Sequence, residues 1–178
     1  MKHKHLTLSI LPLLLLAACT GTTTREYRAA DNSVVARCQY PGDDSLHATW
    51  QFLDANGNPY VKDFDSLRVV ERGPEGHPMT VCFFSGERQQ WLQFYTTMQL
   101  RSQGTIVNGK REGRWIYLFP NGTTQTECTF VDGLEEGSYK VFRENGIPYY
   151  IGQYEHGQRT GTWEIYDEDG TLVTTQTY

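Results

Sequence analysis

Carboxylates and histidines are the side chains in this sequence that could carry acid–base or metal chemistry. Two carboxylate pairs stand out, Asp63 with Asp65 and Glu135 with Glu136. Catalysis by such a pair needs both groups to converge in a pocket, whereas neighbouring carboxylates on edges and turns are more simply explained as solvated charges. We therefore predict no catalytic residue among them, and we expect that the protein is not an enzyme.

The histidines beyond residue 18, which are His47, His77 and His156, show no spacing typical of a metal site or a catalytic triad. Zinc ligands usually come as closely spaced Cys and His pairs, and the sequence has none. His156 takes the place that Asn108 and Asp132 hold in neighbouring stretches of the sequence. This favours a turn residue over a ligand or a base, and we expect no metal and no cofactor.

The N-terminal segment has the three parts of a secretory signal. Lys2 and Lys4 give a basic start, an apolar run covers residues 6–18, and Cys19 follows directly. The run has 13 positions, whereas a transmembrane helix needs about 20. We predict that residues 1–18 are a cleaved signal peptide and not a membrane span.

The end of this segment, Leu16-Ala17-Ala18-Cys19, resembles the bacterial lipobox. The resemblance implies that the Cys19 sulfur carries lipid, that cleavage makes Cys19 the new N-terminus, and that more than one acyl chain anchors the protein stably. Under the sorting rule of that family, Thr20 at the next position implies the outer membrane, with the domain facing the periplasm. The alternative is an ordinary signal with an accidental cysteine, which would give a secreted protein.

The chain beyond Cys19 is long enough for one ordinary domain. Residues 19–31, which are rich in Thr and Ala, are predicted to be a lipidated tether, and residues 32–178 are predicted to be one continuous domain. A tether of about ten residues can reach on the order of 35 Å if extended. Without Lys2 and Lys4 the chain has 14 basic and 21 acidic residues, a charge of −7. This acidity argues against nucleic acid and anionic lipid headgroups as partners.

The most informative pattern is an internal repeat of 24 residues. Residues 109–122, 133–146 and 157–170 align without a gap. The aligned columns are Gly109, Gly133 and Gly157; Gly113, Gly137 and Gly161; Trp115, Tyr139 and Trp163; and Gly122, Gly146 and Gly170. We therefore assign clear repeats to residues 105–178 and degenerate repeats to residues 32–104.

The degenerate repeats keep the spacing of seven residues between an aromatic position and a turn. The pairs are Trp50 with Gly57, Val69 with Gly76, and Trp91 with Met98. Six residues after each turn comes a further column, Asp63, Cys82, Gly104, Cys128, Gly152 and Gln176, which also takes in Cys38 if Asn32 is counted as a first turn. The spacing predicts six hairpin units behind a lead-in strand.

Each unit fits a β-hairpin. The dipeptides Asn-Gly at 121–122 and 145–146 and Asp-Gly at 169–170 suit the centre of a type I′ turn, in which both residues have positive φ. The flanking residues alternate as strands do, and the stretches between paired glycines, such as 109–113, supply the return loops. No helical period occurs, so the sequence predicts an all-β fold.

The unit resembles the MORN repeat, and more closely its shorter bacterial variant, whose signature of Gly-Lys, a second glycine, Trp, Tyr and a closing Gly is present in residues 109–122. The resemblance is strong over residues 106–178 and weak over 38–103. It departs at Val69, which replaces the aromatic residue, and at positions 88–89, which lack the second glycine. The resemblance implies tandem hairpins in one elongated, twisted antiparallel sheet, in which each hairpin contacts mainly its neighbours.

Cys38, Cys82 and Cys128 share one column but lie two hairpins apart each time. Two hairpins place columns roughly 19 Å apart at a strand spacing of about 4.8 Å, whereas bridged Cα atoms must lie within about 7 Å. Regular stacking therefore forbids a bridge between Cys82 and Cys128 and favours small, buried side chains. A Cys38–Cys82 disulfide is the alternative, because an oxidising envelope permits it and the first half is irregular.

The column Trp50, Trp91, Trp115, Tyr139 and Trp163 predicts a ladder of rings along one face of the sheet. If the sheet curls or another layer covers that face, the rings form the core. If part of the face stays open, the rings form a possible binding face for a protein surface, a peptide strand or glycan rings. The sequence leaves both interpretations open.

These features predict a non-enzymatic interaction or scaffold module that is lipid-anchored in the cell envelope and presents its sheet to another protein. Two alternatives stay open. Proteins with the bacterial variant are often described as antitoxin-like, which implies an antitoxin or immunity protein that neutralises a toxin; this rests on the resemblance alone. Alternatively, the aromatic ladder binds peptidoglycan or another polysaccharide.

Overall fold

Every regular element in the described part of the chain is a β-strand. The computed structural model describes residues 21–29, 32–42, 48–74 and 76–178, so the predicted signal peptide and Cys19 lie outside the described residues. The strands are β1 (Thr22–Arg28), β2 (Val34–Pro41), β3 (Thr49–Phe52), β4 (Ser66–Arg72), β5 (Pro78–Ser85), β6 (Arg88–Phe94), β7 (Leu100–Val107), β8 (Lys110–Leu118), β9 (Thr124–Val131), β10 (Leu134–Phe142), β11 (Pro148–Glu155), β12 (Gln158–Tyr166) and β13 (Leu172–Thr177). Within those ranges, no helix long and apolar enough to cross a membrane is present.

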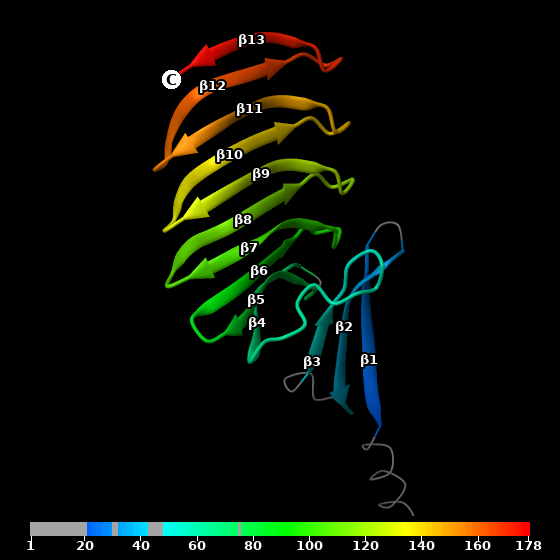
Figure 1. Cartoon of the computed structure of the whole chain (residues 1–178). Coiled ribbons are helices and arrows are strands. Elements are labelled where there is room, and N and C mark those ends of the chain that lie inside the picture. The colour runs from blue at the N-terminus through cyan, green and yellow to red at the C-terminus, as the bar shows by residue number, and fades with distance from the viewer. Residues whose placement is uncertain (1–20, 30–31, 43–47, 75) are drawn as a thin grey trace, which may run out of the picture. The chain divides into compact units, whose positions relative to one another are not determined.

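The chain divides into two compact units, Met1–Tyr60 and Val61–Tyr178, where the sequence predicted one continuous domain over 32–178. The first unit contains a three-stranded sheet in the order β1-β2-β3. The second contains a ten-stranded sheet in which each strand lies beside its neighbours in sequence, from β4 at one edge to β13 at the other (Figure 1). Hairpin follows hairpin, and the sheet is open.

The segment predicted as a tether is largely a strand. Residues 22–28 form β1, which pairs antiparallel with β2 from Thr22 opposite Pro41 to Arg28 opposite Val34. Backbone pairing of this kind replaces the solvation of a free chain, so these residues are not available as a flexible spacer. Only Thr20 and Gly21 lie between Cys19 and β1.

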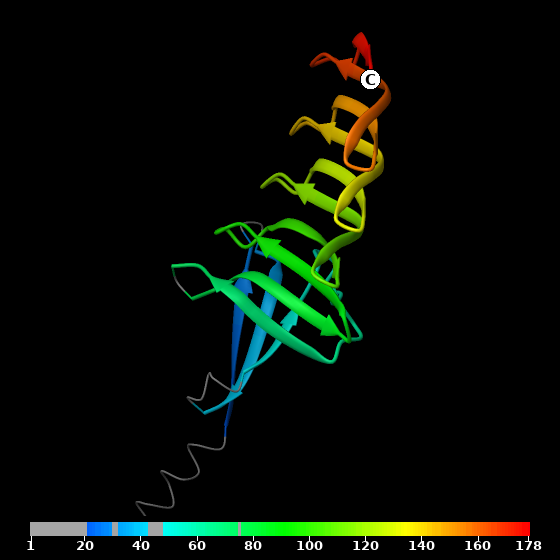
Figure 2. The same cartoon turned by 90° about the vertical axis from the view of Figure 1, so that its left-hand side faces the viewer.

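The second unit confirms the predicted fold class. Its strands are all antiparallel and joined by short turns, as expected for tandem hairpins. Seen from the side, the hairpins stack one above another and their strands curve (Figure 2). The sheet keeps two free edges within the unit, because the described residues place a neighbour on only one side of β4 and of β13.

The predicted turns occur at the predicted positions, but their type differs. Gly122, Gly146 and Gly170 have φ of 85°, 83° and 81°, whereas the residues before them do not have positive φ. The N–H of Gly122 donates to the carbonyl of Phe119 at 2.9 Å, and Phe119 N–H donates to Thr123 at 2.8 Å. This is a three-residue loop that ends in a left-handed glycine, not a type I′ turn.

Type I′ turns occur at the opposite ends of the hairpins, in the return loops. Asn108 and Gly109 have φ of 51° and 77°, Asp132 and Gly133 have 52° and 87°, and His156 has 51°. Both central residues of the turn thus have positive φ, which Asn and Asp tolerate well. The interpretation of His156 as a turn residue is confirmed.

Candidate functional site

The predicted aromatic ladder alternates strand by strand with small residues. Trp91 of β6 lies opposite Cys82 of β5 and opposite Gly104 of β7. Cys128 of β9 lies opposite Trp115 of β8, and also opposite Tyr139 of β10. Because rings occupy every second strand, each ring has room to spread over the small residue beside it.

The small residues are required by close contact with the rings. A Cβ atom added at Gly104 would lie 2.1 Å from a ring carbon of Trp115, and one added at Gly152 would lie 2.1 Å from a ring carbon of Trp163. The two tryptophan rings therefore lie directly against glycine backbone. The prediction of small, buried side chains in this column is confirmed for Cys128, at 3 % exposure.

Burial distinguishes the members of the predicted binding face. Trp115 and Trp163 are only 5 % and 3 % exposed, so their rings belong to the core of the second unit. Trp91 and Tyr139 are half-buried. Trp50 belongs to the first unit, where its ring stacks on those of Tyr27 and Phe52 at centroid distances of 5.5 and 5.8 Å. The ladder in the second unit thus has four aromatic residues, which we call rungs. Two of them, Trp115 and Trp163, are too buried to contact a partner.

Arginines cover two of the rungs. The Arg111 guanidinium lies 4.7 Å from the Trp115 ring centroid, and that of Arg159 lies 4.5 Å from the Trp163 centroid. Arg159 also donates to the Tyr178 hydroxyl at 2.8 Å. A cation over the face of a tryptophan ring is attracted by its quadrupole. The arginines thus shield ring surface that would otherwise face solvent.

Sequence reasoning missed these arginines. Arg111 and Arg159 occupy the same column of the repeat, each four residues before its tryptophan, with a glycine between. That glycine, Gly113 or Gly161, has positive φ and lies at an irregularity in strand pairing. The bulge turns the arginine back over the ring. The shared spacing was the signal that could have found them.

The two buried indoles differ in hydrogen bonding. The Trp115 Nε1–H donates to the Thr105 carbonyl oxygen at 3.1 Å. The Trp163 Nε1, which is equally buried, has no partner. A buried donor without an acceptor loses the free energy of its hydration. The indole N–H of Trp163 on β12 therefore lacks the hydrogen bond that Trp115 makes on β8, four strands earlier.

Glu135 and Glu136, for which the sequence predicted no catalytic role, do not converge. Glu135 and Glu136 are consecutive residues of β10, so their side chains point to opposite faces. The Glu136 carboxylate accepts from the His156 N–H at 2.9 Å and so ties one hairpin to the next. Asp65 accepts from the Gly86 N–H at 2.9 Å. Over the ranges that the structure describes, no group of three or more His, Cys, Asp or Glu residues could hold a metal ion.

The cysteines are buried thiols. The structure joins none of Cys38, Cys82 and Cys128 in a disulfide. Burial raises the pKa of the Cys128 thiol to about 11, and the nearby Glu135 carboxylate adds to the rise. Burial likewise raises the pKa of Cys82. Because the thiolate is the reactive form, we expect the Cys82 and Cys128 thiols to react slowly in the folded protein.

Thiol labelling checks this burial. In a full chain carrying Cys19→Ser, we expect slow reaction with a maleimide at pH 8 and rapid reaction of three thiols once the protein is unfolded in guanidinium chloride. The pKa of Cys128 is raised to about 11 in the folded state, so its rate of labelling should still increase with pH well above the range in which a free thiol has levelled off. Labelling of Cys128 at pH 8 at the rate of a free peptide thiol would contradict the buried column.

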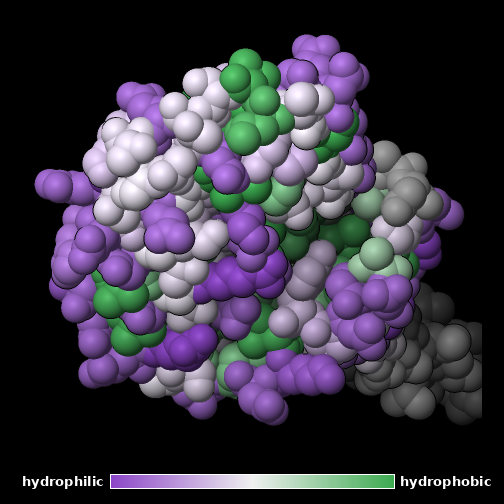
Figure 3. All heavy atoms as spheres, turned by 45° about the horizontal axis from the view of Figure 1, so that its top comes forward, coloured by the Kyte–Doolittle hydropathy of each residue, from purple (hydrophilic) through white to green (hydrophobic). Residues whose placement is uncertain are grey.

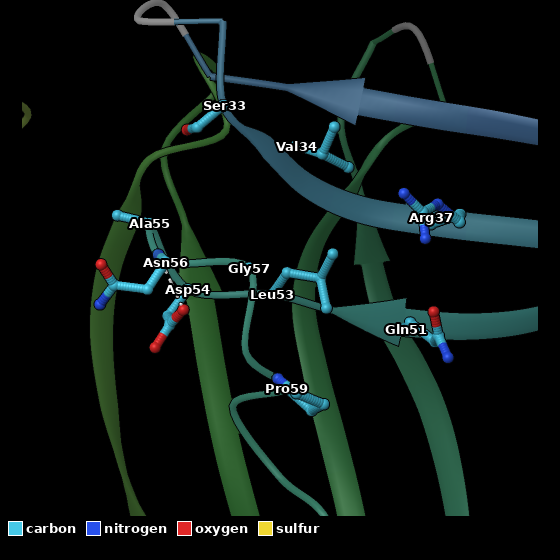
Figure 4. A pocket seen from close by; sticks show the side chains of 10 residues that line it. All are labelled: Ser33, Val34, Arg37, Gln51, Leu53, Asp54, Ala55, Asn56, Gly57 and Pro59. Carbon is cyan, nitrogen blue, oxygen red and sulfur yellow. Dashed lines mark hydrogen bonds between the residues drawn. The ribbon is translucent and has the colours of Figure 1, made fainter.

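A hollow of about 540 Å³ lies within the first unit (Figure 4). Arg37 of β2 and Gln51 of β3 lie opposite each other at one side of it, and Asp54 lies in the loop after β3. Arg37 is held by the Glu26 carboxylate at 2.9 Å, and Asp54 accepts the N–H groups of its own loop. The charged groups that line the hollow thus stabilise the sheet, through Arg37, and the loop after β3, through Asp54.

The last hairpin matches a known family of repeats. Residues 159–178 match the family described as the MORN repeat variant. The second unit is built of MORN-like repeats. The match covers β13 and all of β12 but its first residue, and the preceding hairpins have similar turn glycines.

Other comparisons add little to the MORN-like repeats. No curated protein matches the chain. Among solved structures, a mutant of S. aureus TarM in complex with fondaparinux, alpha-GlcNAc-glycerol and UDP is 8 % identical with a TM-score of 0.35, covering 88 % of this chain and 24 % of that one. A second TarM structure is 10 % identical with a TM-score of 0.24, covering 91 % and 23 %. The chain spans about a quarter of TarM, and such TM-scores carry no argument.

Proposed function

We propose that this protein is a non-enzymatic interaction module, held at the outer membrane of a bacterial envelope by lipid on Cys19 and facing the periplasm. The observation that supports the proposal is a repeated, solvent-exposed row on the MORN-like sheet. Arg114, Ser138 and Thr162 occupy one column of the repeat and are all exposed. Each adjoins a ladder residue in its strand and therefore projects from the opposite face.

The row has the geometry of a contact surface for a protein. Its members lie on every second strand, so successive side chains are roughly 10 Å apart. Arg114 remains largely exposed although it pairs with Glu127 at 2.9 Å. An array of polar side chains on a hydrogen-bonded sheet is largely ordered before binding, which lowers the entropic cost of association.

In the proposed anchor, the segment between the lipidated cysteine and the first strand is short. If Cys19 carries the lipid, only Thr20 and Gly21 separate it from β1, a span of about 7 Å. The first unit would then lie close to the lipid surface, in contrast to the longer tether expected from composition. The antitoxin alternative rests on the repeat family alone, and burial of Trp115 and Trp163 weakens the polysaccharide alternative.

The proposal is tested in cells by fractionation and cross-linking. We expect wild type in the membrane fraction, cross-linked to one recurrent envelope protein, and Cys19→Ser in the soluble fraction. A triple variant, Arg114→Glu with Ser138→Glu and Thr162→Glu, should stay in the membrane fraction and lose the partner at least tenfold.

The control changes charge by the same amount in the opposite sense, away from the row. Glu144→Lys with Glu168→Lys alters two exposed turn residues and should keep the partner. Loss of the partner in both variants, or in neither, would overturn the exposed row as the contact surface, and a membrane-bound Cys19→Ser variant would overturn the anchor.

A further inference from the structure

The last strand, β13, is unlike every other strand of the second unit. All six of its residues are exposed, including Leu172 at 48 % and Val173 at 61 %. Gln176 is exposed, whereas Gly104, Cys128 and Gly152 in the same column of earlier strands are buried. Figure 3, which looks onto the end of the sheet where β13 lies, shows small hydrophobic patches among mainly hydrophilic side chains.

The two edges of the sheet differ in charge. The opposite edge strand, β4, carries Arg68, Glu71 and Arg72, and its pairing with β5 is irregular at two places. Charges and bulges are the devices by which proteins prevent pairing at a sheet edge. The strand β13 carries no charged residue, and three of its six residues are threonines. The pairing of β13 with β12 is also irregular at one place, between Ile165 and Tyr166, so charge is the main difference between the two edges.

Backbone geometry gives the positions of the free groups on β13. The Tyr178 N–H donates to the Gly161 carbonyl of β12 at 3.0 Å, and Gln176 lies opposite Trp163. Since hydrogen-bonded positions alternate along an antiparallel strand, Thr175 and Thr177 direct their N–H and C=O groups away from β12. The Thr175 carbonyl oxygen also accepts from the Thr174 hydroxyl at 3.5 Å, but a carbonyl has two lone pairs and can still accept from another strand.

We propose that β13 pairs antiparallel with β13 of a second copy of this chain, about a two-fold axis at Thr175, giving a continuous sheet of twenty strands. In this register Thr175 lies opposite Thr175 of the second copy, and Thr174 opposite Gln176. Leu172 comes opposite Tyr178, which places two residues of 48 % and 47 % exposure together. Each of these pairs is compatible, and no like charges meet.

The contrast between the edges also explains why the assembly closes. An isologous two-fold contact uses β13 of both copies and leaves β4 at both outer ends. Pairing of β13 with β4 would instead generate an open filament, which the charges and irregularities of β4 oppose. The dimer is independent of what the exposed row binds, because Arg114, Ser138 and Thr162 lie on the face of the sheet and not at its edge.

The test is the oligomeric state of the full lipidated chain in detergent, measured by sedimentation velocity from 1 to 50 µM. We expect a dimer, and a monomer for Thr175→Lys, which would place two lysines directly opposite each other. Val70→Lys puts the same charge on the exposed valine of β4 and should remain a dimer. A monomeric wild type, a dimeric Thr175→Lys or a monomeric Val70→Lys protein would overturn the proposal.

A covalent readout fixes the register. Under mild oxidation, Thr175→Cys should give a disulfide-linked dimer in high yield, since Cα atoms of a hydrogen-bonded pair lie about 5.5 Å apart. Thr162→Cys, on the face of β12, should give little. Equal yields from the two variants, or linked chains longer than two, would contradict a two-fold contact at Thr175. None of these measurements depends on a partner protein.

Discussion

Replacing Gly152 with alanine is expected to lower the free energy of unfolding of the last hairpins by about 3 kcal/mol, at the upper end of the usual cost of overpacking a core. The added Cβ would lie 2.1 Å from a ring carbon of Trp163, so either the ring or the strand must move. The Trp163 ring is held between Tyr154 at 5.3 Å and Tyr178 at 6.1 Å. The Trp163 ring therefore has little room to move away from an added Cβ atom.

The measurement is guanidinium unfolding followed by tryptophan fluorescence and by circular dichroism. Since each repeat contacts mainly its neighbours, we expect β11–β13 to unfold ahead of the rest, so that the fluorescence and circular dichroism transitions separate. Trp163→Leu removes the clashing ring, so Gly152→Ala should cost much less in that background. Gly21→Ala is the control, because nothing lies within 4 Å of its added Cβ.

A cost of Gly152→Ala that persisted in the Trp163→Leu background would contradict the ring-over-glycine contact. The cost would then belong to the strand itself. The double-mutant cycle separates these causes because the two residues are in direct contact.

The turns show what local sequence determines. The repeat predicts turns at seven positions, six from the spacing of seven residues and the first, Asn32, from its distance to Cys38. All seven have positive φ: Asn32, Gly57, Gly76, Met98, Gly122, Gly146 and Gly170. Met98 is the informative member, since its type gives no turn signal and only the repeat period marks it. The turn type was wrong because Asn-Gly fits both a two-residue and a three-residue loop.

The ladder shows which features local sequence could not predict. The column of small residues was predicted as buried, but the reason, a ring lying flat on the glycine of the adjacent strand, depends on pairing across strands. The arginines over Trp115 and Trp163 depend in addition on a bulge at Gly113 or Gly161. Period-two alternation puts Arg111 and Trp115 on the same face but about 13 Å apart along an extended strand, so the close contact depends on the bulge between them.

The first unit shows a different limit. Residues 22–28 are rich in threonine and polar side chains and were predicted as a tether, yet they form β1. Their pairing partner, β2, supplies the order that their own composition does not indicate. The same long-range pairing sets the unit apart from the ten-stranded sheet, which the repeat period alone could not reveal because Trp50 and Gly57 keep the spacing of the later repeats.

Trp115→Ala should have the largest effect on the fold, a loss of about 3–5 kcal/mol typical of removing a buried tryptophan. Its ring lies against Gly104, Phe130 and the Arg111 guanidinium, with Phe130 at 6.2 Å between centroids. Removing the ring opens a cavity, uncovers Gly104 and leaves the Thr105 carbonyl without its donor. Because the hairpin lies in the interior of the sheet, the loss should appear in the global transition.

Substitution by phenylalanine isolates the hydrogen bond. Trp115→Phe and Trp163→Phe remove the same atoms from two equivalent rungs, but only Trp115 has an acceptor for its indole N–H. Trp115→Phe should therefore cost about 1 kcal/mol more, the usual net value of a hydrogen bond plus part of the penalty for an orphaned carbonyl. Equal costs, measured by the same unfolding experiment, would show that Trp163 finds an acceptor in solution, and would remove the difference between the two rungs.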